Sequence, residues 1–302
     1  MHIGASRSVS LCSGVVLSAV GLVAVSGCGS QKVAANGDTD VLTDRARQVA
    51  EAWDGSTAAA AWRAGYYPMG EAVQLPRGGL RGQADRQAYR NRNFVLRGEL
   101  PSTGPKDGHV TWAGDDSVTR PLVGAEELYK TLAGTRTGGE PHLTVTGVKL
   151  GEMTMATSRG PAMVPAWLFT LDGYATPLKQ AAAVPSKYPP APIKAARGIP
   201  GYPLNRLVRV AADGRSVVVV ALHRVCDDDP KVAALETRGS VVLSATVKDH
   251  RDGGTCSKQA SLQQVTVELA RPVDDRVLLD ARTGQPVPYK GLRGISSPPS
   301  RS

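Results

Sequence analysis

The residue best placed for chemistry is Cys28, which ends an apolar run near the N-terminus. The run covers about residues 11–25, and the sequence around the cysteine reads "VSGCGS", so the thiol stands among small residues. A thiol becomes nucleophilic when it ionises, and small neighbours let it enter the cleft of a processing enzyme. The first ten residues carry Arg7 and no acidic residue. A weakly positive start, a short apolar centre and a small-residue exit are typical of a secretory signal peptide.

The segment Val25-Ser26-Gly27-Cys28 resembles a bacterial lipobox, in which the cysteine is acylated and becomes the first residue of the mature chain. The resemblance implies that residues 1–27 are a lipoprotein signal peptide. We therefore expect a lipoprotein, bearing palmitate or a similar acyl chain on Cys28, on the extracytoplasmic face of the cell membrane. Each buried methylene adds about 0.8 kcal/mol of membrane affinity, so two or three chains hold a protein firmly.

Two other interpretations of this N-terminus are an ordinary signal peptide and a transmembrane anchor. A membrane span needs about 20 apolar residues, and this run is shorter and is interrupted by Ser13 and Ser18. No twin-arginine pair precedes it, which favours export by the general secretory route.

The remaining cysteines fit an oxidising compartment. Cleavage removes Cys12, and acylation of Cys28 leaves Cys226 and Cys256 as one pair. We expect a structural disulfide between them. In the chain-entropy model, closing a loop of this size stabilises the folded state by about 3–4 kcal/mol. A metal site or a redox pair is the alternative, because His223 lies three residues before Cys226; however, no second short-spaced ligand pair surrounds Cys256.

A basic segment occupies residues 75–100, within a chain of net charge +9. It contains six arginines and only two acidic residues, Asp85 and Glu99. The candidate anionic-surface patch comprises Arg81, Arg86, Arg90 and Arg92. Outside the membrane, the anions available to such a patch are lipid phosphates and cell-wall polymers, so we expect no nucleic-acid partner. A solvated face with ordinary ion pairs is the plainer alternative.

Hydrophobic periodicity predicts an α+β or mostly β fold. Leu42, Ala46, Val49 and Trp53 recur at helical spacing, and Ser56 can cap a second short helix. A third helix is predicted at 124–132, with Leu128 and Leu132 on one face. The many Gly and Pro residues favour turns and short elements elsewhere.

Strands are predicted in both halves of the chain. Trp167, Phe169 and Leu171 alternate and should point into one core. Asp213-Gly214 lies between two apolar runs, which predicts a hairpin. Further alternating runs at 241–247, 265–269 and 276–279 complete five strands, so we expect a small antiparallel β-sandwich-like domain.

Composition divides the chain into segments. A signal peptide (1–27) and a flexible tether (28–40) precede an α+β domain (41–184). Six prolines in residues 185–203 predict a semi-rigid connector, or alternatively an ordered crossover packed on a sheet. The β-sandwich-like domain (204–290) and a disordered tail (291–302) follow.

A weaker resemblance covers a larger part of the chain. The segment "TSRGPAMVPAWLFTLDGY" (157–174), together with the lipobox and the late cysteine pair, resembles uncharacterised secreted lipoproteins of high-GC actinobacteria. The Arg-rich, Lys-poor composition suits such a source. The resemblance implies an envelope location and carries no catalytic residue over to this chain.

No catalytic motif is recognisable, so we assign no catalytic residue, metal or cofactor. The sequence contains no Walker loop, GxGxxG or HExxH, and no GxSxG after residue 27. Three small-ligand sites are conceivable but disfavoured: sugar stacking on Trp62, Tyr66 and Tyr67, calcium at Asp227–Asp229, and copper at His142, Met153, Met155 and Met163.

We expect a non-enzymatic binding or scaffold module with a protein or polymer partner; a ligand-binding protein or hydrolase with a site assembled from distant residues is the alternative. Such an enzyme predicts a deep pocket, for instance around Asp115 or Asp116 with a histidine.

Overall fold

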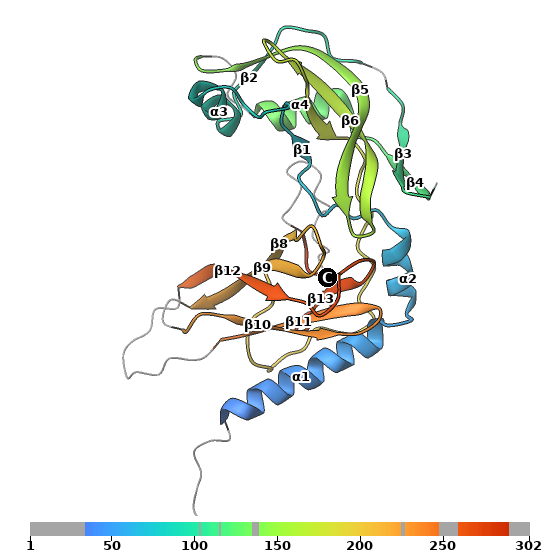
Figure 1. Cartoon of the computed structure of the whole chain (residues 1–302), viewed down its shortest axis with the longest axis vertical. Coiled ribbons are helices and arrows are strands. Elements are labelled where there is room, and N and C mark those ends of the chain that lie inside the picture. Colours follow the sequence, from blue (N-terminus) through green and yellow to red (C-terminus); the bar gives the residue numbers. More distant parts are fainter. Residues whose placement is uncertain are drawn as a thin grey trace, which may run out of the picture.

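The computed structural model has two sheet-built lobes stacked along its longest axis (Figure 1). The structure describes residues 34–102, 104–114, 116–134, 139–224, 227–247 and 259–289. Within these ranges thirteen strands outnumber four helices, which confirms the predicted α+β or mostly β fold.

The upper lobe is one sheet with two helices. Its elements are β1 (Val73–Gln74), β2 (Phe94–Leu96), β3 (Asp107–Trp112), β4 (Ser117–Pro121), β5 (Leu143–Thr157), β6 (Gly160–Leu171), β7 (Leu178–Ala181), α3 (Gln83–Arg90) and α4 (Ala125–Ala133). The strand order is β1-β7-β6-β3-β4, and β5 pairs with β6 and β2. The long antiparallel hairpin β5–β6 therefore forms the centre of the lobe.

The two faces of β6 bury different cores. Trp167, Phe169 and Leu171 join one cluster with Leu128 and Leu132 of α4, as the alternation predicted. On the other face, even-numbered residues of β6 join a second cluster at one end of the strand, which also contains Met153 and Met155 of β5. Toward the other end of the same face Leu168 is only half-buried and Thr170 is exposed, so β6 there faces solvent.

The lower lobe is built from two three-stranded sheets. Its strands are β8 (Arg206–Val210), β9 (Ser216–Arg224), β10 (Lys231–Glu236), β11 (Ser240–Thr246), β12 (Ala260–Glu268) and β13 (Val277–Asp280). The sheets, β12-β9-β8 and β10-β11-β13, bury one shared core that includes Val219 and Leu243.

The lower lobe is sandwich-like, with two differences from the prediction. β10 was not predicted, since its run "KVAALE" lacks strict alternation. The pairing of β11 with β13 is parallel, because the chain crosses to the other sheet and returns between them. The hairpin at Asp213-Gly214 is confirmed: β8 and β9 are antiparallel, and Gly214 has φ +69°.

The first helix, α1 (Ala34–Trp53), packs on the lower lobe. Val49 and Trp53 share a cluster with Val242 and Leu279, and the Trp53 indole N–H donates to the Gly284 carbonyl at 2.7 Å. The sequence had placed this helix with the strands of the upper lobe, because periodicity shows a buried face and not its partner.

Residues 34–40, expected to belong to the flexible tether, are helical. Once a packed helix exists, each added turn costs little, so α1 extends beyond its buried part. The remaining tether residues, 28–33, lie outside the described residues.

The proline-rich segment 185–203 is ordered against the lower lobe. It contains no helix or strand. Arg45 of α1 donates to the Lys194 carbonyl at 2.6 Å, and Arg282 donates to the Ile199 and Gly201 carbonyls. This segment is therefore an ordered crossover, and the predicted domain boundaries stay a prediction.

Candidate functional site

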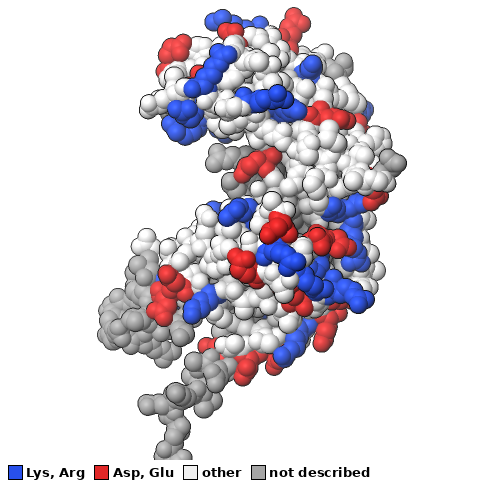
Figure 2. All heavy atoms as spheres, in the orientation of Figure 1, with Lys and Arg blue, Asp and Glu red and all other residues white. Residues whose placement is uncertain are grey.

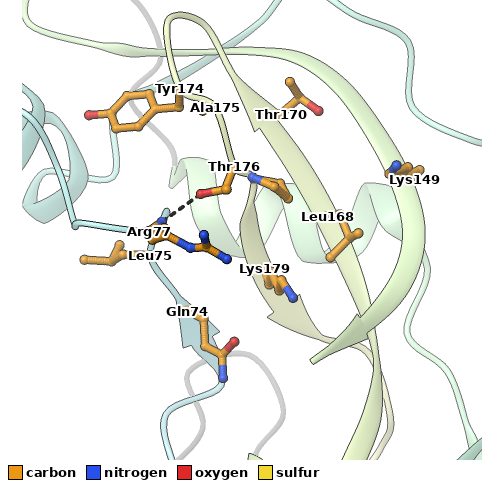
Figure 3. Close-up of a pocket in the computed structure, with 11 residues that line it drawn as sticks. Gln74, Leu75, Arg77, Lys149, Leu168, Thr170, Tyr174, Ala175, Thr176 and Lys179 are labelled. Atoms are coloured by element: carbon orange, nitrogen blue, oxygen red, sulfur yellow. Dashed lines mark hydrogen bonds between the residues drawn. The ribbon is translucent and has the colours of Figure 1, made fainter. Parts of the chain in front are cut away.

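A hollow of about 590 Å³ opens on the outer face of the upper sheet, and Figure 3 shows its lining. Its walls come from β1, β5, β6, β7 and the segments that follow β1 and precede β7. The lining residues are Gln74, Leu75, Arg77, Lys149, Leu168, Thr170, Tyr174, Ala175, Thr176, Pro177 and Lys179.

The floor of the hollow is a single cross-strand row. Lys149 of β5 is the register partner of Leu168 of β6, which is in turn the partner of Lys179 of β7; Lys179 is the partner of Gln74 of β1. Residues opposite one another on paired strands share a face of the sheet, so these four side chains lie side by side. Two cations therefore flank one leucine (Figure 3).

Two glycines lie on the same face of β5 as Lys149. Lys149 has Gly147 and Gly151 two residues away on either side, and side chains two apart on a strand share a face. A Cβ added at Gly151 would lie 2.6 Å from Leu168 Cδ1, so the leucine leans over the space that a side chain would fill. The position of Leu168, a lining residue of the hollow, therefore depends on the glycine at position 151.

Arg77 enters from the segment after β1 and is fixed by its backbone. The Arg77 N–H donates to Thr176 Oγ1 at 2.7 Å, drawn as a dashed line in Figure 3. This bond joins the segment after β1 to the segment before β7. It places the guanidinium of Arg77 in the same hollow as Lys179.

Tyr174 forms the wall of the hollow next to α3. Its hydroxyl donates to Asp85 of α3 and accepts the Arg81 N–H at 3.1 Å, while the Arg81 guanidinium lies 4.8 Å from the ring centroid. Burial, and then the hydrogen bond to Asp85, raises the pKa of Tyr174, so the hydroxyl keeps its proton. The tyrosine thereby ties α3 to the rim of the hollow.

The hollow is positively charged. Its charged lining residues are Arg77, Lys149 and Lys179, and within the described part of the chain no carboxylate pairs with any of them. The Lys179 Nζ donates to the Glu152 carbonyl at 3.2 Å, which leaves further protons free to bind. Two threonine hydroxyls add neutral donors. Such a set of donors suits phosphate or carboxylate oxygens.

Charge is distributed differently on the two lobes. Figure 2 shows Lys and Arg across the visible face of the upper lobe, with Asp and Glu toward its rim. On the lower lobe both signs are interspersed.

The structure separates the four arginines predicted as a patch. Arg86 and Arg90 are exposed, one helical turn apart on α3, and exposed Arg81 lies over the Tyr174 ring. Arg92 instead donates to the Thr131 and Leu132 carbonyls. It therefore caps the C-terminal end of α4, where a cation also complements the helix dipole. Anion binding by the other three stays a prediction.

The small-ligand sites disfavoured by the sequence do not assemble. Trp62, Tyr66 and Tyr67 are buried, and Trp62 stacks on Tyr67 with centroids 4.1 Å apart, so neither ring face is open to a sugar. Burial raises the pKa of Tyr67 to about 12. Met153 and Met155 lie in the core, whereas Met163 is 41% exposed.

The acidic candidates for a catalytic or metal site have other partners. Asp116 pairs with Arg159, whose guanidinium lies 3.9 Å from the Trp112 ring centroid, and Asp227 accepts the Arg224 N–H at 2.8 Å. Asp115 lies outside the described residues. Among the residues the structure describes, no three His, Cys, Asp or Glu side chains gather as a metal site would require.

The predictions for the cysteines lie outside the described residues, since Cys28, Cys226 and Cys256 all fall in gaps. Next to the later gaps, Arg224 of β9 is the register partner of Ala260 of β12. In the sequence, Cys226 follows Arg224 by two residues and Cys256 precedes Ala260 by four. None of the helices in the described ranges is long and apolar enough to cross a bilayer.

Sequence reasoning missed Lys149 and Lys179. Each is a single lysine on a strand, 30 residues apart, and only their common partner on β6 brings them together. The one local sequence feature that marked Lys149 was a glycine two residues before it and another two residues after it on the same strand. Arg77 belonged to the predicted basic segment but not to the four residues of the patch.

Comparison with known proteins returned no match among protein families, curated proteins or solved structures. The hollow is therefore interpreted from its own chemistry.

Proposed function

We propose that this chain is a lipid-anchored protein of the extracytoplasmic envelope that binds an anionic ligand without transforming it. The observation that carries the proposal is the convergence of Arg77, Lys149 and Lys179, from separate parts of the sequence, on one hollow. Their positive charges lack carboxylate partners among the described residues, so a ligand anion gains contacts without displacing an ion pair.

The lining supports binding more than hydrolysis. The lining residues are three cations, one amide, hydroxyl groups and apolar side chains. General acid–base chemistry is carried out most often by histidine, and also by carboxylates, thiols, lysine or tyrosine. The lining residues include no histidine, carboxylate or thiol, and the Tyr174 hydroxyl is already hydrogen-bonded to Asp85 and to the Arg81 N–H.

Location at the membrane rests on the sequence around Cys28. Intact-mass analysis of the chain from the membrane fraction should give a mature protein that begins at Cys28 and carries acyl groups. A chain that keeps residues 1–27, or that has an unmodified N-terminus, would overturn the lipid anchor without touching the anion site. The Cys28→Ala variant should remain uncleaved.

Anion binding is tested on the full chain in a neutral detergent. Tripolyphosphate should raise the melting temperature of the wild type, because a ligand that binds only the folded state stabilises it. The double variant Lys149→Gln/Lys179→Gln should lose most of this stabilisation.

The matched control is Lys231→Gln, which removes an exposed cation from β10 of the lower lobe. It should behave as the wild type. Equal stabilisation of the wild type and the double variant would overturn the assignment of the site.

A further inference from the structure

We infer that the ligand of the hollow is a linear polymer with negative charges repeated along its length, and not a single small anion. This inference rests on the proposed anion-binding function and concerns the same site. It follows from how exposed the cations are, how they are spaced, and what lies next to them.

The exposure of the cations limits what one anion can gain. Arg77 and Lys149 are exposed and Lys179 is half-buried. Exposed charge pairs are individually weak, because water screens them. Three such pairs together fall short of even a millimolar dissociation constant. A lone phosphate group is therefore held weakly at this site.

The spacing of the cations suits charges in series. The row from Lys149 to Gln74 crosses four strands, and neighbouring strands are about 4.8 Å apart, so it extends about 14 Å. Lys149 and Lys179 stand two strands apart within it. A chain with several charges can meet both at once, and each linked contact then forms at high effective concentration.

The positive surface continues beyond the hollow. Tyr174 in its wall carries the Arg81 guanidinium over its ring, and α3, tied to the same tyrosine through Asp85, presents Arg86 and Arg90. A polymer leaving the hollow past Tyr174 meets further cations, whereas a small ligand does not. Three of the four arginines of the predicted patch, Arg81, Arg86 and Arg90, thus extend the positive surface of the hollow.

The arrangement favours a polymer over the phosphates of the bilayer that holds the anchor. The Ala34 end of α1 and the upper lobe lie at opposite ends of the longest axis (Figure 1). Residues 28–33 can span at most about 20 Å when extended, so an anchor at Cys28 keeps the lower lobe nearest the membrane. The lobe that carries the hollow is then the one farther from the membrane, where envelope polymers are available.

The test measures affinity per phosphate as a function of chain length. Orthophosphate, tripolyphosphate and longer inorganic polyphosphates of defined length are titrated against the full chain in neutral detergent. A site that holds one phosphate gives the same affinity per phosphate at every length. A site that holds several in series gives a value that rises by at least about tenfold until the polymer spans the row.

Two comparisons locate and identify the effect. The rise in affinity per phosphate with polymer length should be lost in Lys149→Gln/Lys179→Gln and reduced in Arg86→Gln/Arg90→Gln. The same rise should be kept in Lys231→Gln. Soluble short-chain phosphatidylglycerol should compete no better than orthophosphate.

The outcomes separate the two proposals. If the affinity per phosphate does not depend on polymer length but is lost in Lys149→Gln/Lys179→Gln, the inference of a polymer ligand is wrong and the proposed anion site is retained. If the short-chain lipid displaces the polymer at equal phosphate concentration, the ligand is a lipid headgroup, and the inference of a polymer ligand is again wrong. No lysine-dependent binding of any phosphate would overturn the proposed function itself.

Discussion

Lys149 of β5 and Lys179 of β7 lie in one cross-strand row, two strands apart, with Leu168 between them. At a strand spacing of about 4.8 Å their Cα atoms are about 10 Å apart, and like charges at this distance repel by only about 0.4 kcal/mol in water. The fold can therefore keep both lysines on one open face at little cost. They add positive charge to this face and contribute little to stability.

Replacing both lysines should leave the fold intact. Neither makes an ion pair in the described residues, and surface substitutions of this kind change stability by less than about 0.5 kcal/mol. Urea unfolding of Lys149→Gln/Lys179→Gln should therefore match the wild type. A loss above about 2 kcal/mol would show that the two lysines stabilise the fold, contrary to a role in ligand binding alone.

Removing the Tyr174 hydroxyl should loosen α3 locally. The hydroxyl donates to Asp85 and accepts the Arg81 N–H, so Tyr174→Phe should cost about 1–3 kcal/mol. Hydrogen exchange should accelerate in residues 81–90 and stay unchanged in β5 and β6. Tyr129→Phe, which loses a 3.2 Å bond to the Phe94 carbonyl, serves as the control and should not affect α3. Faster exchange throughout the sheet would contradict a local role.

The lower lobe should lose stability in acid through Glu236. Its side chain pairs with Arg276 at 2.9 Å, and the Arg276 and Glu236 side chains are 4% and 16% exposed. Burial alone would raise the pKa of Glu236, but hydrogen bonds from the Ala270 N–H, Arg276 and the Arg271 N–H outweigh it, so the pKa is lowered.

A lowered pKa in the folded state fixes the sign of the pH effect. The stabilisation is complete above the unfolded value of about 4.3 and disappears as pH falls through the lower folded value. Glu236→Gln should cost about 1.5–3 kcal/mol at pH 7 and flatten the decline in unfolding free energy below about pH 5. Glu268→Gln, at an exposed position, should keep the wild-type profile. An unchanged acid profile in Glu236→Gln would refute the assignment.

How far the sequence predicted the structure depended on whether the information was local. The alternation of Trp167, Phe169 and Leu171 identified a buried face correctly, because period-two patterning records burial directly. The helical face of Val49 and Trp53 was also predicted, but its partner was not: α1 packs on strands about 190 residues later in the chain.

The candidate site could not be predicted for the same reason. Lys149 and Lys179 become neighbours only through the register of β6, which no short-range pattern encodes. The basic segment was visible in the sequence, but the capping role of Arg92 depends on where α4 ends in space. The hollow therefore combines Arg77 from the basic segment with two lysines that only long-range strand pairing brings together.

We predict that the cysteine pair is oxidised, in keeping with the proposed envelope location. Arg224 and Ala260, next to the two cysteines in sequence, are paired at the end of the β9–β12 ladder, so a bond between Cys226 and Cys256 would close a loop that begins and ends there. Alkylation of the denatured, unreduced chain should label neither cysteine, and reduction should expose both. Labelling of both thiols before reduction would exclude the disulfide.

The salt dependence of polyphosphate binding tests the proposed polymer site most directly. For flexible polyanions the slope of log K against log salt falls by about 0.7 for each cation that contacts the chain. If Lys149 and Lys179 both contact the polymer, their replacement by Gln should reduce the slope by about 1.4, whereas Lys231→Gln should leave it unchanged. A slope in the double variant equal to that of the wild type would contradict binding in the hollow, because the polymer would then bind elsewhere.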